Sequence, residues 1–153
     1  MRSVYVFCAD GFEEVEGLTA VDLLRRAGVS VTMVSIMGRT KITGARNISV
    51  NTDILIEDIK EEADMLVLPG GMPGTINLGE SDAVRKAILA MNDAGKIVAA
   101  VCAAPGVLGK YGLLEGKTAC SFPQHEKNLI GATVVREPVV VDGNIVEQRW
   151  ILV

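Results

Sequence analysis

Short apolar runs alternate along the chain with longer segments in which apolar and polar residues mix. The runs are rich in β-branched residues and predict buried strands at 4–8, 29–36, 64–68 and 96–101. The mixed segments predict helices at 13–27, at 82–93 and from Pro105 to about Gly112. Weaker strand patterns follow at 118–121 and around Val139 and Ile145. Strands and helices that alternate with short loops predict an α/β fold with a mostly parallel sheet covered on both faces.

Local signals set some of the boundaries between these elements. Ser81 is an N-cap residue for the helix at 82–93, and Gly95 ends that helix. The segment 41–51 alternates loosely and predicts a small hairpin, while 54–62 predicts a short helix. The sequence contains no internal repeat, low-complexity tract or linker, so we expect one domain over residues 1–153.

Composition and charge narrow the range of partners. The 153 residues are 49% hydrophobic and 22% charged, which are average values for a globular chain. The formal net charge is -4 and lysine and arginine do not cluster, which argues against a nucleic-acid partner. No apolar run approaches the ~18 residues of a membrane span, so we expect no membrane partner.

The cysteine and histidine counts limit the possible chemistry. Cys8, Cys102 and Cys120 are an odd number of cysteines at wide spacings, which favours a reduced, cytoplasmic chain with free thiols. His125 is the only histidine, so a histidine-rich metal site is excluded, and we expect neither a metal nor a cofactor. Cys8 and Cys120 lie in apolar runs typical of packing thiols. His125 lies in a polar stretch that favours a solvated loop residue.

Cys102 lies where a predicted strand stops and a predicted helix begins. A sharp turn of this kind requires small residues two positions away on either side, and Ala100 and Ala104 meet that requirement. Pro105 fits the first position of the following helix. The positive end of that helix favours the thiolate over the thiol. Cys102 is therefore a candidate nucleophile, although a buried cysteine that only fills space remains the alternative.

Glu16 interrupts an apolar stripe of the first predicted helix. The stripe continues at helical spacing through Ala20, Leu23, Leu24 and Ala27. A carboxyl group on this face should lie near the end of the first strand and be pushed towards its neutral form. A neutral carboxyl group there would donate a hydrogen bond to the thiolate of Cys102. Glu13 and Glu14 are interpreted instead as charges that complement the helix dipole.

A glycine pair follows the third buried strand. Gly70 and Gly71 allow backbone N–H groups to point at a ligand without side-chain obstruction. Together with the N–H of Ala103, this loop would form an oxyanion hole. The spacing matches neither a dinucleotide-binding glycine motif nor a P-loop, so we predict no nucleotide site.

Once these three turns are located, the sequence resembles the ThiJ/PfpI superfamily up to about Ile145. It is most similar to the branch of the parkinsonism-associated deglycase. The matching segments are DGFEEVE at 10–16, RRAG at 25–28, VLPGG at 67–71, AAVCAAP at 99–105 and GLLEGK at 112–117. The resemblance implies a flavodoxin-like three-layer sandwich that forms a homodimer.

The resemblance also implies roles for individual residues. Cys102 matches the nucleophile of the superfamily, and Glu16 matches its protonated partner. Gly71 and Ala103 match the oxyanion donors, with Gly70 beside them. Arg46 matches a basic residue that the branch uses near the pocket or the dimer contact.

Three departures from the superfamily pattern matter. Peptidase-like members carry histidine directly after the cysteine, where this chain has Ala103, and this disfavours a Cys-His amidase. Phe122 stands before the proline of a later turn where the branch often has histidine, and His125 lies three residues further on. Members continue from the last strand into a Gly-Pro turn and a closing helix, whereas this chain ends with 147–153. We therefore expect the fold without its C-terminal helix.

We expect a cofactor-free cysteine enzyme of the glyoxalase or deglycase type, in which Cys102 attacks the carbonyl of a small reactive aldehyde or of its protein adduct. One alternative is a redox-sensing or chaperone-like protein of oxidative stress that uses the same oxidisable cysteine. An amidase or peptidase is a further alternative. A role in thiazole monophosphate synthesis follows only from the naming of the superfamily.

Overall fold

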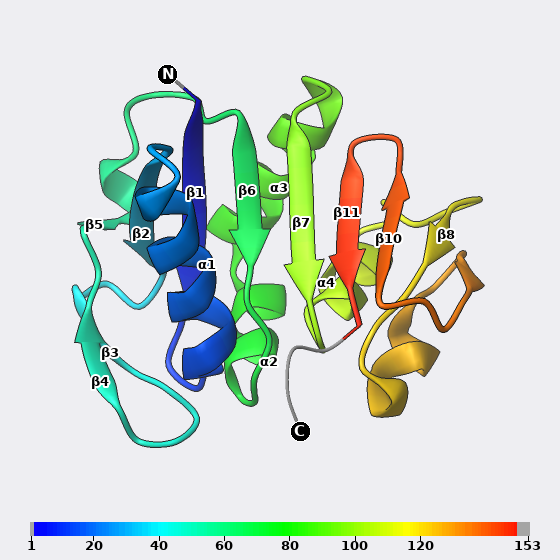
Figure 1. Cartoon of the computed structure of the whole chain (residues 1–153), viewed down its shortest axis with the longest axis horizontal. Coiled ribbons are helices and arrows are strands. Elements are labelled where there is room, and N and C mark those ends of the chain that lie inside the picture. Colours follow the sequence, from blue (N-terminus) through cyan, green and yellow to red (C-terminus); the bar gives the residue numbers. More distant parts are fainter. Residues whose placement is uncertain (1, 150–153) are drawn as a thin grey trace.

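A seven-stranded sheet forms the centre of the computed structural model, which describes residues 2–149 (Figure 1). Its strands are β1 Ser3–Cys8, β2 Ser30–Ser35, β5 Ile54–Leu55, β6 Met65–Leu68, β7 Ile97–Val101, β10 Val139–Asp142 and β11 Ile145–Gln148. The strand order is β10-β11-β7-β6-β1-β2-β5. All neighbours are parallel except β10 and β11. The parallel strands therefore present their carboxyl ends along one edge.

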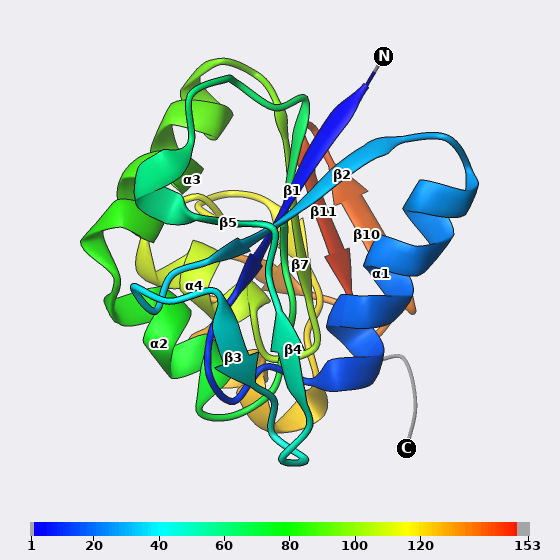
Figure 2. The ribbon, with the colours of Figure 1, turned by 90° about the vertical axis from the view of Figure 1, so that its left-hand side faces the viewer.

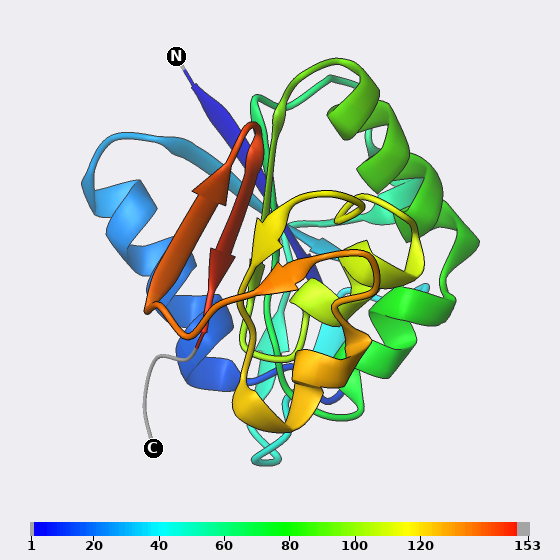
Figure 3. The same ribbon diagram turned by 90° about the vertical axis from the view of Figure 1, so that its right-hand side faces the viewer.

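Helices cover both faces of this sheet. They are α1 Glu14–Arg26, α2 Gly74–Glu80, α3 Asp82–Asp93 and α4 Pro105–Lys110, with 3-10 turns at Ile56–Asp58 and Pro123–Asn128. Helix α1 lies on one face, and α2, α3 and α4 lie on the other (Figures 2 and 3). Successive side chains of β1 accordingly enter two separate apolar clusters, Phe7 on the three-helix side and Val6 on the α1 side. The predicted α/β fold with a mostly parallel sheet covered on both faces is confirmed.

Two small sheets lie outside the central one. The first is the hairpin of β3 Lys41–Thr43 and β4 Ser49–Asn51, which confirms the hairpin predicted at 41–51. The second pairs β8 Thr118–Ala119 with β9 Thr133–Val134 in parallel. The hairpin lies at the carboxyl ends of the parallel strands, and β8 lies beside β10 at one edge of the central sheet (Figure 1).

The structure differs from the prediction in two segments near the sheet. No helix forms over 54–62, because Ile54 and Leu55 pair with the edge of β2 and only a 3-10 turn follows. Helix α2 was not predicted, since the Pro- and Gly-rich sequence before it is typical of a loop. It forms because Leu78 is fully buried and Gly74 lies directly against the backbone of the turn after β1.

Helix α1 is rotated relative to the predicted stripe. Its buried residues are Glu14, Glu16, Gly17 and Val21, whereas Leu23 is 58% exposed. Gly17 explains the rotation, because a Cβ there would come within 2.9 Å of the ring of Phe12. A glycine does not contribute to an apolar sequence pattern, yet its missing side chain allows the helix to approach the sheet most closely. The predicted stripe is therefore wrong at Leu23 and Ala27, which are exposed, whereas Leu24 packs against the apolar cluster and the burial of Glu16 is confirmed.

Other predicted boundaries agree with the structure. The hydroxyl of Ser81 accepts a hydrogen bond from the N–H of Val84, and α3 ends at Asp93 before Gly95. Pro105 is the first residue of α4.

Within residues 2–149, no helix has the length and apolar character needed to cross a membrane. The expectation that the closing helix is missing concerns the end of the chain, which lies outside the described residues.

Candidate active site

Cys102 occupies a strained turn directly after β7. Its φ angle is 60°, and within residues 2–149 only Asn47 shares a positive φ among non-glycine residues. This left-handed conformation costs about 1–2 kcal/mol and occurs mainly where function requires it. Two backbone hydrogen bonds hold the turn: the N–H of Cys102 donates to the carbonyl of Gln148 at 2.9 Å, and its carbonyl accepts from the N–H of Phe122 at 2.7 Å. The structure therefore has the sharp elbow predicted at Cys102.

Glu16 approaches the elbow from the first turn of α1. It is 7% exposed, and its Oε2 accepts a hydrogen bond from the N–H of Gly70 at 2.9 Å. The carboxyl group lies close enough to Cys102 that it raises the pKa of the thiol. Glu13 caps the helix, since its Oε2 accepts from the N–H of Glu16 at 2.9 Å. The acid and the cysteine thus meet at the carboxyl ends of the strands.

Gly70 lies between these two side chains. A Cβ at this position would come within 2.5 Å of Glu16 Oε2 and 2.8 Å of Cys102 Cβ. The absence of a side chain is therefore a condition for the contact between acid and cysteine. The N–H of Gly70 is directed at Glu16, so in this structure it holds the acid and does not face the cavity.

The pKa values of both groups in the Cys102–Glu16 pair are raised. Burial raises the pKa of Glu16. Burial and the neighbouring Glu16 charge raise the pKa of the Cys102 thiol to about 12, and the N–H of Ala103 offsets part of this increase. The net effect is a thiol pKa above its usual value, against the expectation that the start of the helix favours the thiolate. An ionised sulfur at neutral pH therefore requires the proton to reside on Glu16.

A cavity of about 530 Å³ opens over this pair. Its lining residues are Glu13, Val15, Glu16, Ala45, Arg46, Gly71, Met72, Cys102, Ala103, Phe122 and His125. They come from α1, the β3–β4 hairpin, the loop after β6, the elbow and the 3-10 turn at 123–128. The structure thus brings the predicted Cys102, Glu16, Gly71, Ala103 and Arg46 to one cavity.

His125 also lines this cavity, although its polar surroundings favoured a solvated loop. The hydrogen bond from the N–H of Phe122 to the carbonyl of Cys102 folds the 3-10 turn back over the elbow. Burial, together with the charge of Lys127, lowers the pKa of His125 below its usual value. The ring is therefore neutral at pH 7. A contact made through a backbone hydrogen bond leaves no signal in the sequence.

Glu14 does more than complement the helix dipole. Its buried carboxyl group accepts hydrogen bonds from the N–H of Arg46 at 2.8 Å and of Ile48 at 3.4 Å. Gly44 lies so close to this carboxyl group that a Cβ would overlap it. Glu14 therefore fixes the hairpin that carries Arg46 to the cavity wall, a role that sequence reasoning missed.

A second buried acid lies beside a second cysteine. Glu147 is 1% exposed; its Oε2 accepts a hydrogen bond from the N–H of Cys120 at 3.0 Å, and its Oε1 has no partner among the described residues. Burial raises the pKa of Glu147 to about 7. Cys120 is fully buried, as is Cys8, which agrees with the prediction that both are packing thiols. Nothing in the local sequence distinguished Glu147 from an exposed strand residue.

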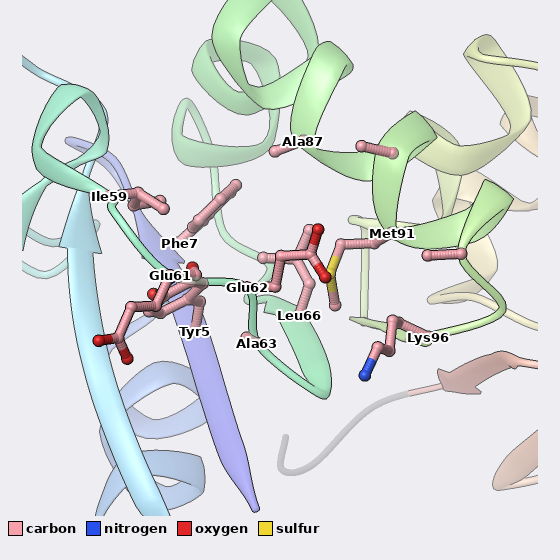
Figure 4. A pocket seen from close by; sticks show the side chains of 12 residues that line it. Tyr5, Phe7, Ile59, Glu61, Glu62, Ala63, Leu66, Ala87, Met91 and Lys96 are labelled. Atoms are coloured by element: carbon pink, nitrogen blue, oxygen red, sulfur yellow. Dashed lines mark hydrogen bonds between the residues drawn. The ribbon is translucent and has the colours of Figure 1, made fainter.

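A smaller cavity of about 170 Å³ lies at the opposite end of the sheet, beneath α3 (Figure 4). Apolar side chains of β1, β6 and α3 surround it, among them Phe7, Leu66 and Met91. No cysteine lines it. In the part of the chain that the structure describes, no three His, Cys, Asp or Glu side chains converge to hold a metal ion. The chemistry is therefore concentrated at the elbow.

These features define a flavodoxin-like α/β protein with a cysteine on a strand-to-helix elbow beside a buried acid. The chain belongs to the DJ-1/PfpI family, whose sequence profile matches residues 2–149. A Pyrococcus abyssi protein named as a deglycase is 39% identical over 150 residues, which cover 95% of this chain and 89% of that protein. Protein dj-1beta of Drosophila melanogaster is 35% identical over 151 residues, covering 97% and 81%.

Solved structures agree with this family membership. The structure of oxidized Toxoplasma gondii DJ-1 has a TM-score of 0.91 and 32% sequence identity to this chain, covering 97% of this chain and 82% of that chain. The resemblance predicted from the five sequence segments is thereby confirmed, and so is the flavodoxin-like fold.

Proposed function

We propose that this chain is a cysteine-dependent enzyme of the glyoxalase or deglycase type, which acts on small reactive carbonyls or on their adducts with proteins. The observation that carries the proposal is the contact between the strained Cys102 and the buried Glu16 at an open cavity. The name of the deglycase relative supports the same class of substrate. The expectations of a cytoplasmic location and a homodimer belong to this proposal as well.

The reaction begins with transfer of the Cys102 proton to Glu16. The sulfur adds to the aldehyde carbon of methylglyoxal, and Glu16 returns the proton to the new alkoxide to give a hemithioacetal. Glu16 then removes the proton from that carbon and delivers it to the adjacent carbonyl carbon. The hydroxyl proton of the hemithioacetal moves to the oxygen of that carbonyl, which leaves a thioester of lactate on Cys102. Water hydrolyses the thioester. The net reaction adds one water to methylglyoxal and yields lactate, so no cofactor or external oxidant is consumed.

Backbone N–H groups would stabilise the alkoxide. Gly71 and Ala103 both line the cavity next to the sulfur. Gly71 has a φ of 93°, and a side chain there would overlap the backbone before α1, so only glycine fits this part of the wall. Arg46 would orient the second oxygen of the substrate from the hairpin side. These assignments follow the expectation from the sequence and the positions of the residues in the cavity.

The proposal is tested by replacing Cys102 with alanine and measuring methylglyoxal consumption and lactate formation. Cys120→Ala is the matched control, since Cys120 is sealed from the cavity. We expect Cys102→Ala to lose turnover completely and Cys120→Ala to retain it. Turnover by Cys102→Ala at the rate of the parent chain would refute the proposed function.

The oxidized Toxoplasma gondii DJ-1 structure favours a second candidate function, a redox sensor. The Cys102 thiolate would displace water from hydrogen peroxide to form a sulfenic acid, and a second peroxide would give the sulfinic acid. Intact-mass measurement after mild peroxide treatment tests this function. A gain of two oxygen atoms at Cys102 in a chain that consumes no aldehyde would favour the sensor over the enzyme.

A further inference from the structure

A second cavity continues from the one above Cys102. It has a volume of about 300 Å³ and shares Met72, Ala103 and His125 with the first cavity. Its other lining residues are Thr75, Ile76, Gly106, Val107, Lys110, Asn128 and Ile130. Ala103, the residue after Cys102, lines both, so the two cavities adjoin next to the elbow.

The rim of this second cavity is unusually apolar for a surface. Met72 is 41% exposed, Ile76 50% and Ile130 63%, and all three line the same space. Single exposed apolar residues need no explanation, whereas a group around a cavity marks a place where a ligand is bound. This rim therefore fits an aliphatic or aromatic side chain of a ligand.

A buried hydroxyl group at the same place has no partner. Thr75 is 8% exposed and lines the cavity, and its Oγ1 makes no hydrogen bond within residues 2–149. Leaving a buried hydroxyl unpaired costs about 1–3 kcal/mol. A ligand with a carbonyl or amide group would satisfy it. The apolar rim and the polar hydroxyl together match a peptide, which presents an apolar side chain next to a polar backbone amide.

The sizes of the two cavities favour the same ligand. Pockets that bury drug-sized ligands measure about 300–1,000 Å³. A cavity of about 530 Å³ beside one of about 300 Å³ offers far more space than a three-carbon aldehyde requires. Lys110 is the one charged residue that lines the second cavity, and its ammonium group already donates to the carbonyl of Gly79 at 2.6 Å. An uncharged apolar group is thus accepted there.

We propose that Met72, Thr75, Ile76 and Ile130 form a subsite for the apolar side chain that flanks a carbonyl-modified residue in a peptide substrate. The modified residue enters the Cys102 cavity, and the peptide crosses Ala103 so that its neighbouring residue contacts the subsite. This proposal rests on the proposed function and names the substrate more closely: carbonyl adducts of peptides with a large apolar neighbour.

The test compares methylglyoxal adducts of two acetylated dipeptide amides, in which leucine or serine precedes the modified lysine. We expect the parent chain to prefer the leucine adduct, and Ile76→Ser to reduce the leucine-to-serine ratio of kcat/KM about tenfold. Val141→Ser is the matched control, because Val141 is 66% exposed on β10 and lines neither cavity. Equal kcat/KM for both adducts in the parent chain would overturn the subsite.

A second variant separates binding from stability. Thr75→Val keeps the shape and removes the unpaired hydroxyl, so we expect an unchanged or higher Tm but a higher KM for the leucine adduct. An unchanged KM would contradict the role of Thr75.

Methyl NMR of Cys102→Ala distinguishes failure of the subsite from failure of the proposed function. Shifts of Ile76 and Ile130 on addition of the leucine dipeptide support the subsite even if no adduct is turned over, and their absence counts against it.

Discussion

Residues 2–149 contain two pairs of a buried glutamate and a cysteine, and one of these pairs faces a cavity. In the first, Glu16 contacts the thiol of Cys102 at the elbow. In the second, Glu147 contacts the backbone N–H of Cys120, whose thiol points to the carbonyl of Glu147 at 3.6 Å. Burial raises the thiol pKa in both pairs, to about 12 for Cys102 and about 11 for Cys120.

Under the proposed function, a raised thiol pKa does not by itself decide which cysteine reacts. The two pairs differ in whether the thiol is accessible from a cavity and in whether the carboxyl group lies next to the thiol or binds the backbone N–H of the cysteine. Cys102 lines the cavity beside the carboxyl group of Glu16, to which it passes its proton in the proposed mechanism. The carboxyl group of Glu147 accepts from a backbone N–H, and Cys120 is fully buried. Of these two cysteines, only Cys102 has a positive φ, at 60°. Reactivity thus follows from local proton transfer and exposure.

The largest difference should appear in alkylation by iodoacetamide. Cys120 reacts only after the surrounding structure opens, and an opening free energy of about 4 kcal/mol slows labelling about 10³-fold. We expect peptide mass spectrometry over a time course to show labelling of Cys102 long before Cys120. Similar labelling rates for the two thiols would mean that Cys120 is not buried in solution.

The next largest effect concerns the two acids. Glu16→Gln keeps an oxygen that accepts from the N–H of Gly70 but removes the proton acceptor, so we expect methylglyoxal turnover to fall about 10²–10⁴-fold. Without the Glu16 charge the pKa of Cys102 also decreases, so the residual rate should rise with pH. Glu147→Gln should leave turnover within about twofold. Equal losses in both variants would show that Glu16 acts only through folding.

The pKa of Glu147 predicts a pH dependence of stability. The carboxyl pKa is raised from 4.5 to about 7 in the folded state. Between these values the folded chain binds more protons than the unfolded chain, so the free energy of unfolding falls as pH rises, by about 3 kcal/mol in all. We expect Glu147→Gln to remove this slope in urea unfolding at pH 5 and pH 8. A slope that persists in the variant would assign it to other groups.

The sequence predicted the layers of the fold and the centre of the site because both leave local signals. Buried parallel strands give continuous apolar runs, and the elbow at Cys102 requires the small residues that flank it. Glu16 was recognisable because a charged residue stood where burial was expected. These features depend on neighbours within a few positions of the chain.

The parts that were missed depend on contacts across the fold. His125 reaches the cavity through a hydrogen bond of Phe122, and Glu14 binds the hairpin 32 positions further on. Glu147 gains its environment from β7 and β8, which no pattern within β11 contains. The buried face of α1 was partly misassigned because Gly17 packs against Phe12 only by lacking a side chain, which an apolar pattern does not record. Such effects need the tertiary structure.

The smallest expected effect tests the strain that separates the two cysteines. At a φ of 60° a side chain costs about 1 kcal/mol or more, so Cys102→Gly should be more stable than Cys102→Ala by about 1 kcal/mol. At Cys120, where φ is not positive, glycine only adds entropy to the unfolded chain, so Cys120→Gly should be less stable than Cys120→Ala by a similar amount. Chemical denaturation of the four variants measures this reversal of sign. The same order at both positions would mean that the elbow relaxes once the sulfur is removed, and that the strain at Cys102 is maintained by its contact with Glu16.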